Sequence, residues 1–547
     1  MEPHPSPEEL LTQIYGEATA RNHRMRLESL LSGPTTVRSE FGLSERDALL
    51  ITYADQIQEP GRAPLQTLAD FAERHWKGVF SGVHILPFYP STSDDGFSVQ
   101  DYLAVDPALG TWTDVRRLGR NFDLMFDAVF NHLSAKSDWF KRFCEGDPGY
   151  QDFFVTVEGH PDLSQVIRPR ALPLLTDFVT SSGNRRVWTT FSADQVDLNF
   201  HNPEVLFAVL EVLLFYVRQD ARFIRLDAIA FLWKEIGTTC LHRPQTHAVI
   251  QLFRAVLRRV APHVCLITET NVPHADNVSY FGDGTNEAQL VYNFALPPLV
   301  LHSLTTGRAT ALTHWAQQLR LPSNEVTFFN FLASHDGIGI NPVRGILTEA
   351  EIEALVTRSR AHGGFVSDKH LPDGSRVPYE LNINWGDALS EVSDSVEVRV
   401  RRLLCSFAIQ LALQGVPGLY FHSAMGSRGD REGALRSGIP RRINREKLLR
   451  ERLEEELAEA GSERARVWAG LKDLLSFRRR HSAFSPRGLQ RVLLEDERIF
   501  AVERTSPDGS SRVNCWHNVS AHVVTIQCGG GELRLGPWEF RWEPSLA

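Results

Sequence analysis

The sequence predicts an α/β protein: a closed (β/α)₈ TIM barrel with inserted subdomains and a C-terminal all-β domain. Eight short apolar runs of strand length recur between residues 48 and 423, and longer helical or loop segments separate them. Beyond about residue 485, apolar and polar residues alternate between turn signals, which indicates a small β domain. An open doubly wound sheet is the alternative fold, but no G-x-G-x-x-G follows the first run.

The elements follow in chain order. Residues 1–46 predict a helical extension, in which Ser6 is suited to cap a helix that begins at Pro7. The barrel is expected in two parts, residues 47–134 and 196–484. Its eight strands are expected within residues 48–55, 83–90, 123–132, 223–231, 264–271, 289–296, 326–336 and 416–423.

Two connections are much longer than a crossover helix needs. Residues 135–195 predict an inserted B subdomain, and residues 360–395 predict a long loop rich in turn residues. Insertions after barrel strands lie over the C-terminal face, where such barrels hold their sites. We therefore expect both segments to shape a site, with residues 485–547 forming the C-terminal β domain away from it.

Composition limits the function classes. The formal net charge of −9 and a pI near 6.1 give no reason to expect a nucleic-acid or membrane partner, and a small-molecule substrate remains open. The first residues lack the features of a signal peptide, so a cytoplasmic location is expected. The six cysteines are scattered singly, which argues against a zinc site or disulfides. The oligomeric state cannot be read from the sequence.

The apolar runs end in polar and charged residues of the kinds that take part in catalysis. The stretch "FIRLDAIAF" places Arg225 and Asp227 on one side of a strand that is otherwise apolar. In a barrel such strand ends converge on one pocket. The endings supply Asn131, His132, Arg225, Asp227, Glu269, His335 and Asp336. Glycosyl transfer is the chemistry that needs at least two facing carboxylates.

Local environment separates the roles of the carboxylates. A cation within about 4 to 6 Å favours an ionised carboxylate, so Arg225 beside Asp227 suits a nucleophile. Glu269 follows an apolar run without a neighbouring cation, and burial would raise its pKa toward that of a general acid. Asp336 would then bind sugar hydroxyls and favour the charge-developing ring.

Each residue also has a purely structural interpretation. Arg225 and Asp227 could form a structural ion pair, His132 or His335 could be a hydrogen-bonded core histidine, and Glu269 could be a helix N-terminal charge. Their joint placement at four strand ends favours a site. A barrel without catalysis that only binds sugar is a further alternative, and the presence of all three acids argues against it.

Four motifs carry a family resemblance. "DAVFNH", "RLDAIAF", "LITETN" and "FLASHD" resemble, in order, the four signature regions of the α-amylase superfamily, glycoside hydrolase family 13, from about Leu49 to Glu451. Segments such as "VWTTFSADQVDL" and "RRINR" are similar to the sucrose phosphorylase group. This resemblance implies a retaining glycosyltransferase that passes a glucosyl unit to phosphate through a covalent glucosyl-aspartyl intermediate, releasing α-glucose 1-phosphate. It implies no metal and no cofactor, with inorganic phosphate as co-substrate.

The resemblance assigns roles position by position. It implies Asp227 as nucleophile, Glu269 as acid/base and Asp336 as transition-state stabiliser. Donor-glucose contacts are implied for Asp94, His132, Arg225, His335 and Arg441, with Phe191 and Gln195 lining the site. Arg170 and Tyr379 match residues that contact phosphate, although Arg170 could instead pair with a surface acid and Tyr379 could only shape its loop.

The acceptor side departs from the sucrose enzymes. Val377 to Glu380 replace the Asp-Leu-Tyr-Gln of that group, which puts fructose as the acceptor in doubt. The longer loop, the segment 423–448 and the helical extension resemble the glucosylglycerate phosphorylases. An anionic acceptor such as glycerate would need an extra cation, supplied by Arg376, Arg428, Lys369 or His370, with Glu380 beside it. Sucrose, sucrose 6′-phosphate or glucosylglycerol phosphorylase, or an α-glucosidase or transglucosidase, are the alternative activities.

Overall fold

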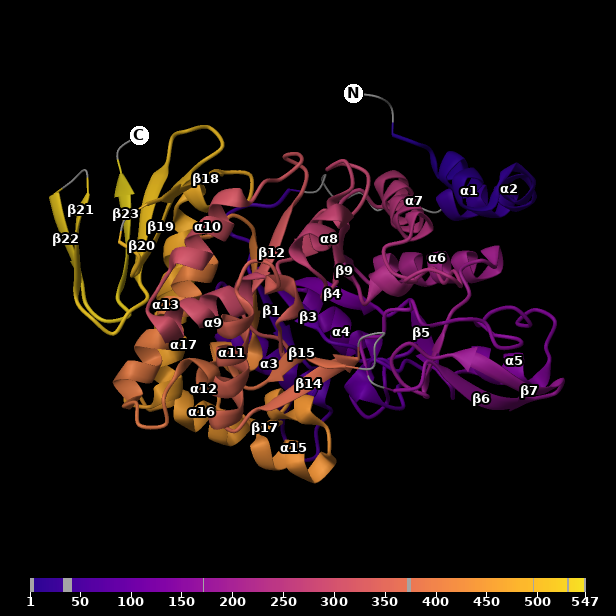
Figure 1. Cartoon of the computed structure of the whole chain (residues 1–547), viewed down its shortest axis with the longest axis horizontal. Coiled ribbons are helices and arrows are strands. Elements are labelled where there is room, and N and C mark those ends of the chain that lie inside the picture. The colour runs from indigo at the N-terminus through magenta and orange to yellow at the C-terminus, as the bar shows by residue number, and fades with distance from the viewer. Residues whose placement is uncertain are drawn as a thin grey trace.

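A closed barrel of eight parallel strands forms the centre of the computed structural model (Figure 1), which describes residues 4–32, 42–170, 172–370, 375–494, 496–528 and 531–545. Each expected apolar run overlaps one barrel strand, although β3 begins at Gly82 and β9 at Ala221, just before their runs, so the predicted barrel is confirmed. Around the barrel the order is β1 (Leu49–Thr52), β16 (Val416–Tyr420), β12 (Thr327–Phe331), β11 (Leu290–Tyr292), β10 (Cys265–Thr268), β9 (Ala221–Leu226), β4 (Asp123–Ala128) and β3 (Gly82–Ile85).

Helices cover the outside of the barrel and bury the outward faces of the strands. Helix α6 (Pro203–Arg218) shows how the sequence forms them, because Asn202 caps its first turn and Pro203 takes the first helical position. Apolar residues such as Leu206 and Leu213 are fully buried on that helix. Other helices of this layer are α3 (Pro64–His75), α4 (Trp112–Gly119), α7 (Pro244–Val260), α9 (Leu296–Thr306), α13 (Val396–Ala412) and α17 (Glu463–Arg480).

The N-terminal helices α1 (Pro7–Tyr15) and α2 (Glu17–Leu31) pack beside α7, at the edge of the barrel (Figure 1). Ser6 and Glu9 form a reciprocal capping box that starts α1. The hydroxyl of Tyr15 donates a hydrogen bond to the backbone oxygen of Phe200, at 2.7 Å. This contact ties the N-terminal helices to the segment that leads into α6.

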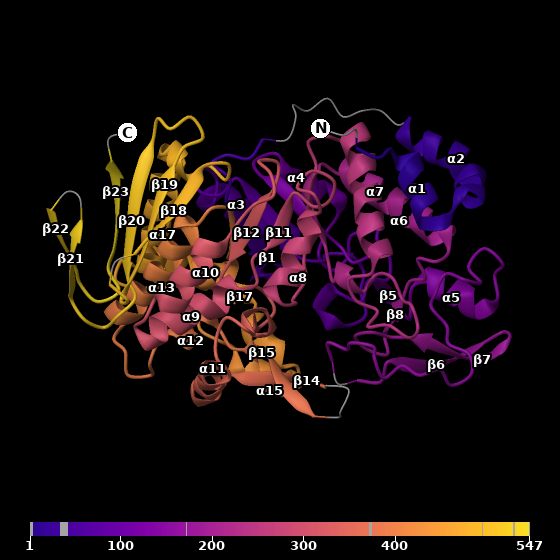
Figure 2. The same ribbon diagram turned by 45° about the horizontal axis from the view of Figure 1, so that its top comes forward.

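Two groups of strands project from the C-terminal ends of the barrel strands. After β4, the hairpin of β6 (Leu175–Thr180) and β7 (Gly183–Trp188) extends outward, while β5 (His132–Ser134) pairs with β8 (Gln195–Asp197). After β12, strands β13 (Ile338–Gly339), β15 (Arg376–Asn382) and β14 (Phe365–His370) form an antiparallel sheet beside α11 (Glu349–Ala361). Figures 1 and 2 show both groups on the same side of the barrel.

The C-terminal sheets lie at the far side of the barrel from the β6–β7 hairpin (Figure 1). One sheet has the order β18 (Leu489–Leu493), β19 (Ile499–Thr505), β20 (Arg512–Asn518) and β23 (Phe540–Ser545), and the other pairs β21 (Val524–Cys528) with β22 (Gly531–Leu535). The predicted all-β end of the chain is therefore confirmed. Among the described residues, no helix is long and apolar enough to cross a membrane.

Candidate active site

A cavity opens where the barrel strands end, between the two projecting groups of strands. Most of the residues predicted for the site line it, and they come from segments that are far apart in the chain. They are Asp94, His132, Arg170, Phe191, Gln195, Asp227, Glu269, His335, Asp336, Tyr379, Glu380 and Arg441. Arg225 lies behind Asp227 with only 2% of its surface exposed. The convergence of the strand ends has the physical cause that the sequence suggested, namely a closed parallel barrel.

Arg225 connects the acidic residues at the base of the cavity. Its Nη1 donates to Asp227 Oδ1 at 2.7 Å, and its Nη2 lies 3.7 Å from Glu269 Oε1. The same Nη1 also donates to Asp127, whose Oδ2 is 2.7 Å from His84 Nε2. Asp127 was not among the predicted site residues. Its signal was a charged residue inside the apolar third run, which is the same signal that drew attention to Arg225 and Asp227.

Burial raises the pKa of Asp227 to about 8, although Arg225 acts in the opposite direction. The expectation that Arg225 holds Asp227 ionised is therefore wrong for the empty site, because burial and the charges of Glu269 and Asp127 outweigh Arg225. Burial likewise raises the pKa of Glu269, as predicted. The two carboxyls titrate as a pair, because the charge of Glu269 raises the pKa of Asp227.

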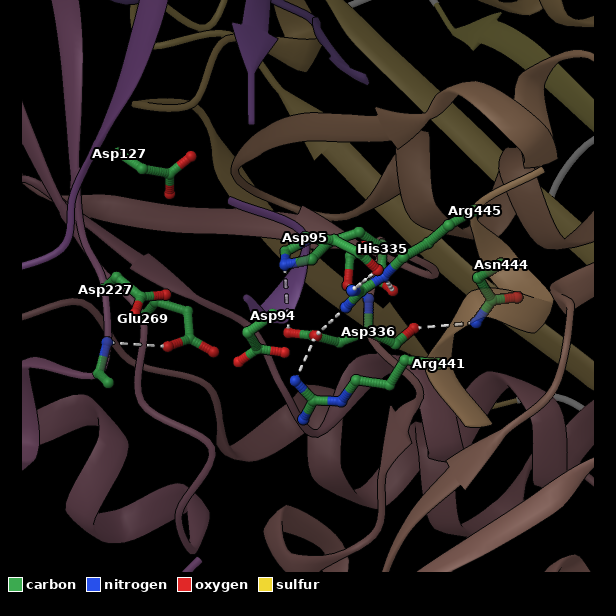
Figure 3. Close-up of polar contacts among 12 residues, drawn as sticks. Asp94, Asp95, Asp127, Asp227, Glu269, His335, Asp336, Arg441, Asn444 and Arg445 are labelled. Atoms are coloured by element: carbon green, nitrogen blue, oxygen red, sulfur yellow. Dashed lines mark hydrogen bonds and ion pairs between the residues drawn. The ribbon is translucent and has the colours of Figure 1, made fainter. Parts of the chain in front are cut away.

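The backbone after Asp227 orients Glu269. Ala228 adopts a left-handed conformation with φ of 48°, which turns the chain sharply at the end of β9. Its backbone N–H donates to Glu269 Oε2 at 3.1 Å. The turn that follows one carboxylate therefore fixes the other, and Figure 3 shows Asp227 and Glu269 next to each other with this hydrogen bond drawn.

Asp336 is surrounded by cations (Figure 3). Arg441 Nη1 lies 2.7 Å and Arg445 Nη2 3.3 Å from Asp336 Oδ1, while Asn444 Nδ2 donates to the backbone oxygen of Asp336 at 3.0 Å. Burial disfavours the charge, but Arg441 and Arg445 outweigh it and lower the pKa of Asp336. Sequence reasoning found Arg441 but not Arg445 or Asn444, which belong to the same "RRINR" motif.

Asp94 lies opposite Asp336 and is held by two polar residues from the B-subdomain segment. Arg170 Nη2 lies 2.7 Å and Gln195 Nε2 3.3 Å from Asp94 Oδ2. Burial opposes ionisation, but Arg170 and Arg441 lower the pKa of Asp94. Asp94 has a φ of 54°, a conformation uncommon for residues with a Cβ, and such strain is often found where a side chain serves a site.

The two predicted histidines are neutral at physiological pH. Burial lowers the pKa of His335 to about 3, and it also lowers the pKa of His132. His335 stacks on Phe97 with ring centroids 4.8 Å apart, and the ring centroid of His132 lies 5.2 Å from that of Phe191. Neutral rings that packing holds in place can accept or donate hydrogen bonds to sugar hydroxyls without adding charge.

The part of the cavity wall that β15 forms contains Tyr379 and Glu380. Glu380 is 2% exposed and accepts two hydrogen bonds from Arg441, at 3.0 and 2.7 Å. Burial raises the pKa of the Tyr379 hydroxyl, so this side chain stays a neutral hydrogen-bond donor. Arg441 therefore connects Glu380 on β15 to Asp336 on the loop between β12 and β13.

Arg376, Arg428 and Lys369, three of the cations expected for an anionic acceptor, are not among the described residues that line this cavity. Arg428 Nη2 is instead 2.6 Å from Asp387 Oδ1, and Lys369 Nζ donates to Asn341 Oδ1 at 2.9 Å. Arg376 is exposed at the start of β15, and the side chain of His370 lies outside the described residues. The prediction of Arg376 and Arg428 as acceptor contacts is not supported, because Asp387, distant in sequence, holds Arg428 elsewhere.

A buried lysine lies behind the cavity. Lys234 Nζ donates to Asn131 Oδ1 at 2.6 Å and lies 2.6 Å from Asp197 Oδ2. Asn131 and Asp197 are fully buried, and Asn131 Nδ2 also donates to Asp197 Oδ2 at 3.1 Å. The ammonium group supplies the positive charge between these oxygens. Within the described part of the chain, no group of three or more His, Cys, Asp or Glu side chains could hold a metal ion.

Known proteins match this fold and this sequence. Residues 78–341 match the family described as alpha amylase, catalytic domain. The chain is 54% identical to glucosylglycerate phosphorylase of Allomeiothermus silvanus over 515 residues, which cover 94% of this chain and 92% of the relative. The chain belongs to the α-amylase family, among its glucoside phosphorylases.

Two further matches support membership of this family. Glucosylglycerate phosphorylase of Escherichia coli is 44% identical over 550 residues, which cover 97% of this chain and 98% of that protein. The crystal structure of sucrose 6F-phosphate phosphorylase from Thermoanaerobacter thermosaccharolyticum aligns with a TM-score of 0.77 and 25% identity, covering 93% of this chain and 99% of that one. The predicted resemblance to the family is confirmed over nearly the whole chain.

Proposed function

We propose that this chain is a retaining glucosylglycerate phosphorylase, which transfers a glucosyl unit from glucosylglycerate to inorganic phosphate and releases α-glucose 1-phosphate. The observation that carries this proposal is the identity to two phosphorylases of that name, 54% and 44%, over nearly the full length. The cavity supports it, because it brings three acids and two arginines together at the strand ends.

The first half of the reaction uses the coupled pair of carboxyls. In the form of the pair that reacts, the shared proton is on Glu269 and Asp227 is ionised. Asp227, bound to Arg225, attacks the anomeric carbon, while the Glu269 carboxyl protonates the oxygen that leaves with glycerate. The C–O bond to glycerate breaks as an ester bond to Asp227 forms. The raised pKa of Glu269 suits this donation near neutral pH.

Phosphate completes the reaction in the second half. A phosphate oxygen attacks the anomeric carbon of the ester, Glu269 accepts its proton, and the carboxylate of Asp227 is released. Two inversions at one carbon retain the α configuration, so the product is α-glucose 1-phosphate. Arg170 and Tyr379 are the groups proposed to hold phosphate, and phosphate is the only co-substrate required.

The remaining lining residues hold the glucosyl unit. Asp94, His132, His335 and Arg441 line the cavity and are the proposed contacts of the glucosyl hydroxyls, and Phe191 and Gln195 form further parts of its wall. Asp336 is kept ionised by Arg441 and Arg445, so it can stabilise the positive charge that develops on the ring. In this role Asp336 binds the transition state more strongly than the substrate.

Phosphate dependence tests the proposal. Purified protein incubated with glucosylglycerate should form glucose 1-phosphate only when phosphate is added, and free glucose without phosphate would indicate a hydrolase. In the reverse direction, glucose 1-phosphate should release phosphate faster with glycerate than with fructose, fructose 6-phosphate or glycerol. Preference for any of the last three would replace the proposed acceptor and leave the phosphorylase assignment intact.

A further inference from the structure

Asn271 lines the cavity, and none of the roles described above belongs to it. It lies two residues after Glu269, on the loop that follows β10. Its Oδ1 atom is buried and has no hydrogen-bond partner among the described residues. Buried polar side-chain atoms are nearly always hydrogen bonded, so an oxygen of this kind in the wall of a cavity points to a ligand that completes it.

Gly339 leaves room for the Asn271 amide. A Cβ atom at Gly339 would lie 2.7 Å from Asn271 Oδ1 and 2.8 Å from Nδ2. Any side chain at this position of β13 would therefore displace the amide. The close approach of the β13 backbone thus holds Asn271 in place by packing, without a hydrogen bond from the protein to Oδ1.

The position of Asn271 is on the acceptor side. Gly339, which contacts its amide, is the register partner of Glu380 in the pairing of β13 with β15, and Tyr379 precedes Glu380. Glu269, which is proposed to protonate the leaving oxygen, is two residues away. Asn271 therefore lies between Glu269 and β15. In this position it would contact the leaving group rather than the glucosyl ring that Asp94 is proposed to bind.

Several polar side chains near Asn271 in the wall already have partners in the protein. Arg441 contacts Asp336 and Glu380, and Arg170 contacts Asp94. The residue next to Asn271 is Thr270, whose hydroxyl donates to Asn277 Oδ1 at 2.6 Å. The oxygen of Asn271 is therefore available to a ligand without the loss of an existing hydrogen bond.

We infer that Asn271 determines acceptor specificity, by donating from Nδ2 to the carboxylate of the acceptor and accepting at Oδ1 from its neighbouring hydroxyl. This inference rests on the proposed function, because glycerate is a small acid that carries both groups. A neutral amide suits the position, since an acidic side chain there would repel an anionic acceptor and would also add charge beside Glu269.

Kinetics in the direction of synthesis test this role. In Asn271→Ala, the KM for glycerate should rise by about 10- to 100-fold, the usual effect of losing a hydrogen bond to a charged group. The KM for glucose 1-phosphate should change less than twofold. In Asn271→Asp, the KM for glycerate should rise more than the KM for glycerol, because only glycerate is repelled.

Gly339→Ala provides a second route to the same change. It leaves Asn271 in the sequence but pushes its amide away, so the KM for glycerate should rise as in Asn271→Ala. In the double variant the two increases in the KM for glycerate should not be additive, because both substitutions remove the same contact. Asn324→Ala is the matched control, an exposed asparagine on the loop before β12 at the other end of the barrel, and it should leave both KM values unchanged.

Three outcomes decide the inference. A change in the glycerate KM of less than threefold in Asn271→Ala, or an equal rise in the KM for glucose 1-phosphate, would overturn it. A wild-type protein that releases no phosphate with glycerate would refute the proposed acceptor instead. The same comparison of KM values is then made with the acceptor that the wild-type protein uses, and the threefold criterion again decides the role of Asn271.

Discussion

Arg170 Nη2 lies 2.7 Å from Asp94 Oδ2, so the guanidinium proposed to bind phosphate is held by a carboxylate proposed to bind glucose. In the empty site, Arg170 and Asp94 are therefore bonded to each other, although Arg170 is proposed to bind phosphate and Asp94 to bind the glucosyl unit. A glucosyl unit that takes the hydrogen bonds of Asp94 would release Arg170 toward phosphate. This relationship favours an order in which the sugar binds before phosphate.

Asp94→Asn tests the pairing of Asp94 with Arg170. Loss of the carboxylate should weaken donor binding, yet it should strengthen phosphate binding to the empty protein by roughly 3- to 10-fold, because Arg170 no longer has a charged partner. Isothermal titration with inorganic phosphate measures the second effect. Arg170→Ala in the same background should remove the gain, and unchanged phosphate affinity in Asp94→Asn would contradict the pairing.

Asp227→Asn should abolish turnover and preserve the fold. An amide cannot form the glucosyl ester, so phosphate-dependent formation of glucose 1-phosphate should fall by about 10⁴-fold or more. Burial already disfavours the charge of Asp227, as its raised pKa shows, so the thermal unfolding midpoint should not fall markedly. Appreciable phosphorolysis by a pure, folded variant would refute the assignment of Asp227.

Glu269→Gln should change the pH dependence of the first half-reaction. The charge of ionised Glu269 raises the pKa of Asp227, so a neutral glutamine should lower that pKa. The rate with α-glucosyl fluoride, whose leaving group needs no protonation, falls as pH drops through the pKa of Asp227. That acid limb should therefore move to lower pH in the variant.

The control for this pH experiment is Glu432→Gln, which neutralises a carboxylate that is 86% exposed. Its profile should coincide with that of the wild-type protein. An acid limb that stays in place or moves to higher pH in Glu269→Gln would show that the two carboxyls do not titrate together.

Lys234→Met should destabilise the protein. The substitution removes the cation between Asn131 and Asp197 and leaves a buried carboxylate uncompensated, which costs about 3 to 5 kcal/mol. Urea unfolding at pH 7 measures the loss. Lys234→Met combined with Asp197→Asn should recover part of it, and equal stability of the single and double variants would contradict a charge-based role.

Much of this protein follows from local sequence patterns. Each of the eight barrel strands overlaps a predicted apolar run, because strands buried on both faces need continuous apolar residues. Asp227 and Glu269 directly follow the strands that form in these runs, and Asp336 is the last residue of its run. Closure of the barrel then brings them together, so their convergence could be predicted without coordinates.

Other features depend on contacts between segments that no local pattern connects. Arg428 is paired with Asp387 rather than with an acceptor, Arg170 reaches Asp94 across 76 positions, and the amide of Asn271 fits against Gly339. Such partners are set by how long loops pack over the barrel. The pKa of Asp227 likewise depends on the burial of several charges at once. The pattern of apolar runs therefore located the proposed catalytic acids, whereas the packing of the loops decided their charge states and the proposed acceptor contacts.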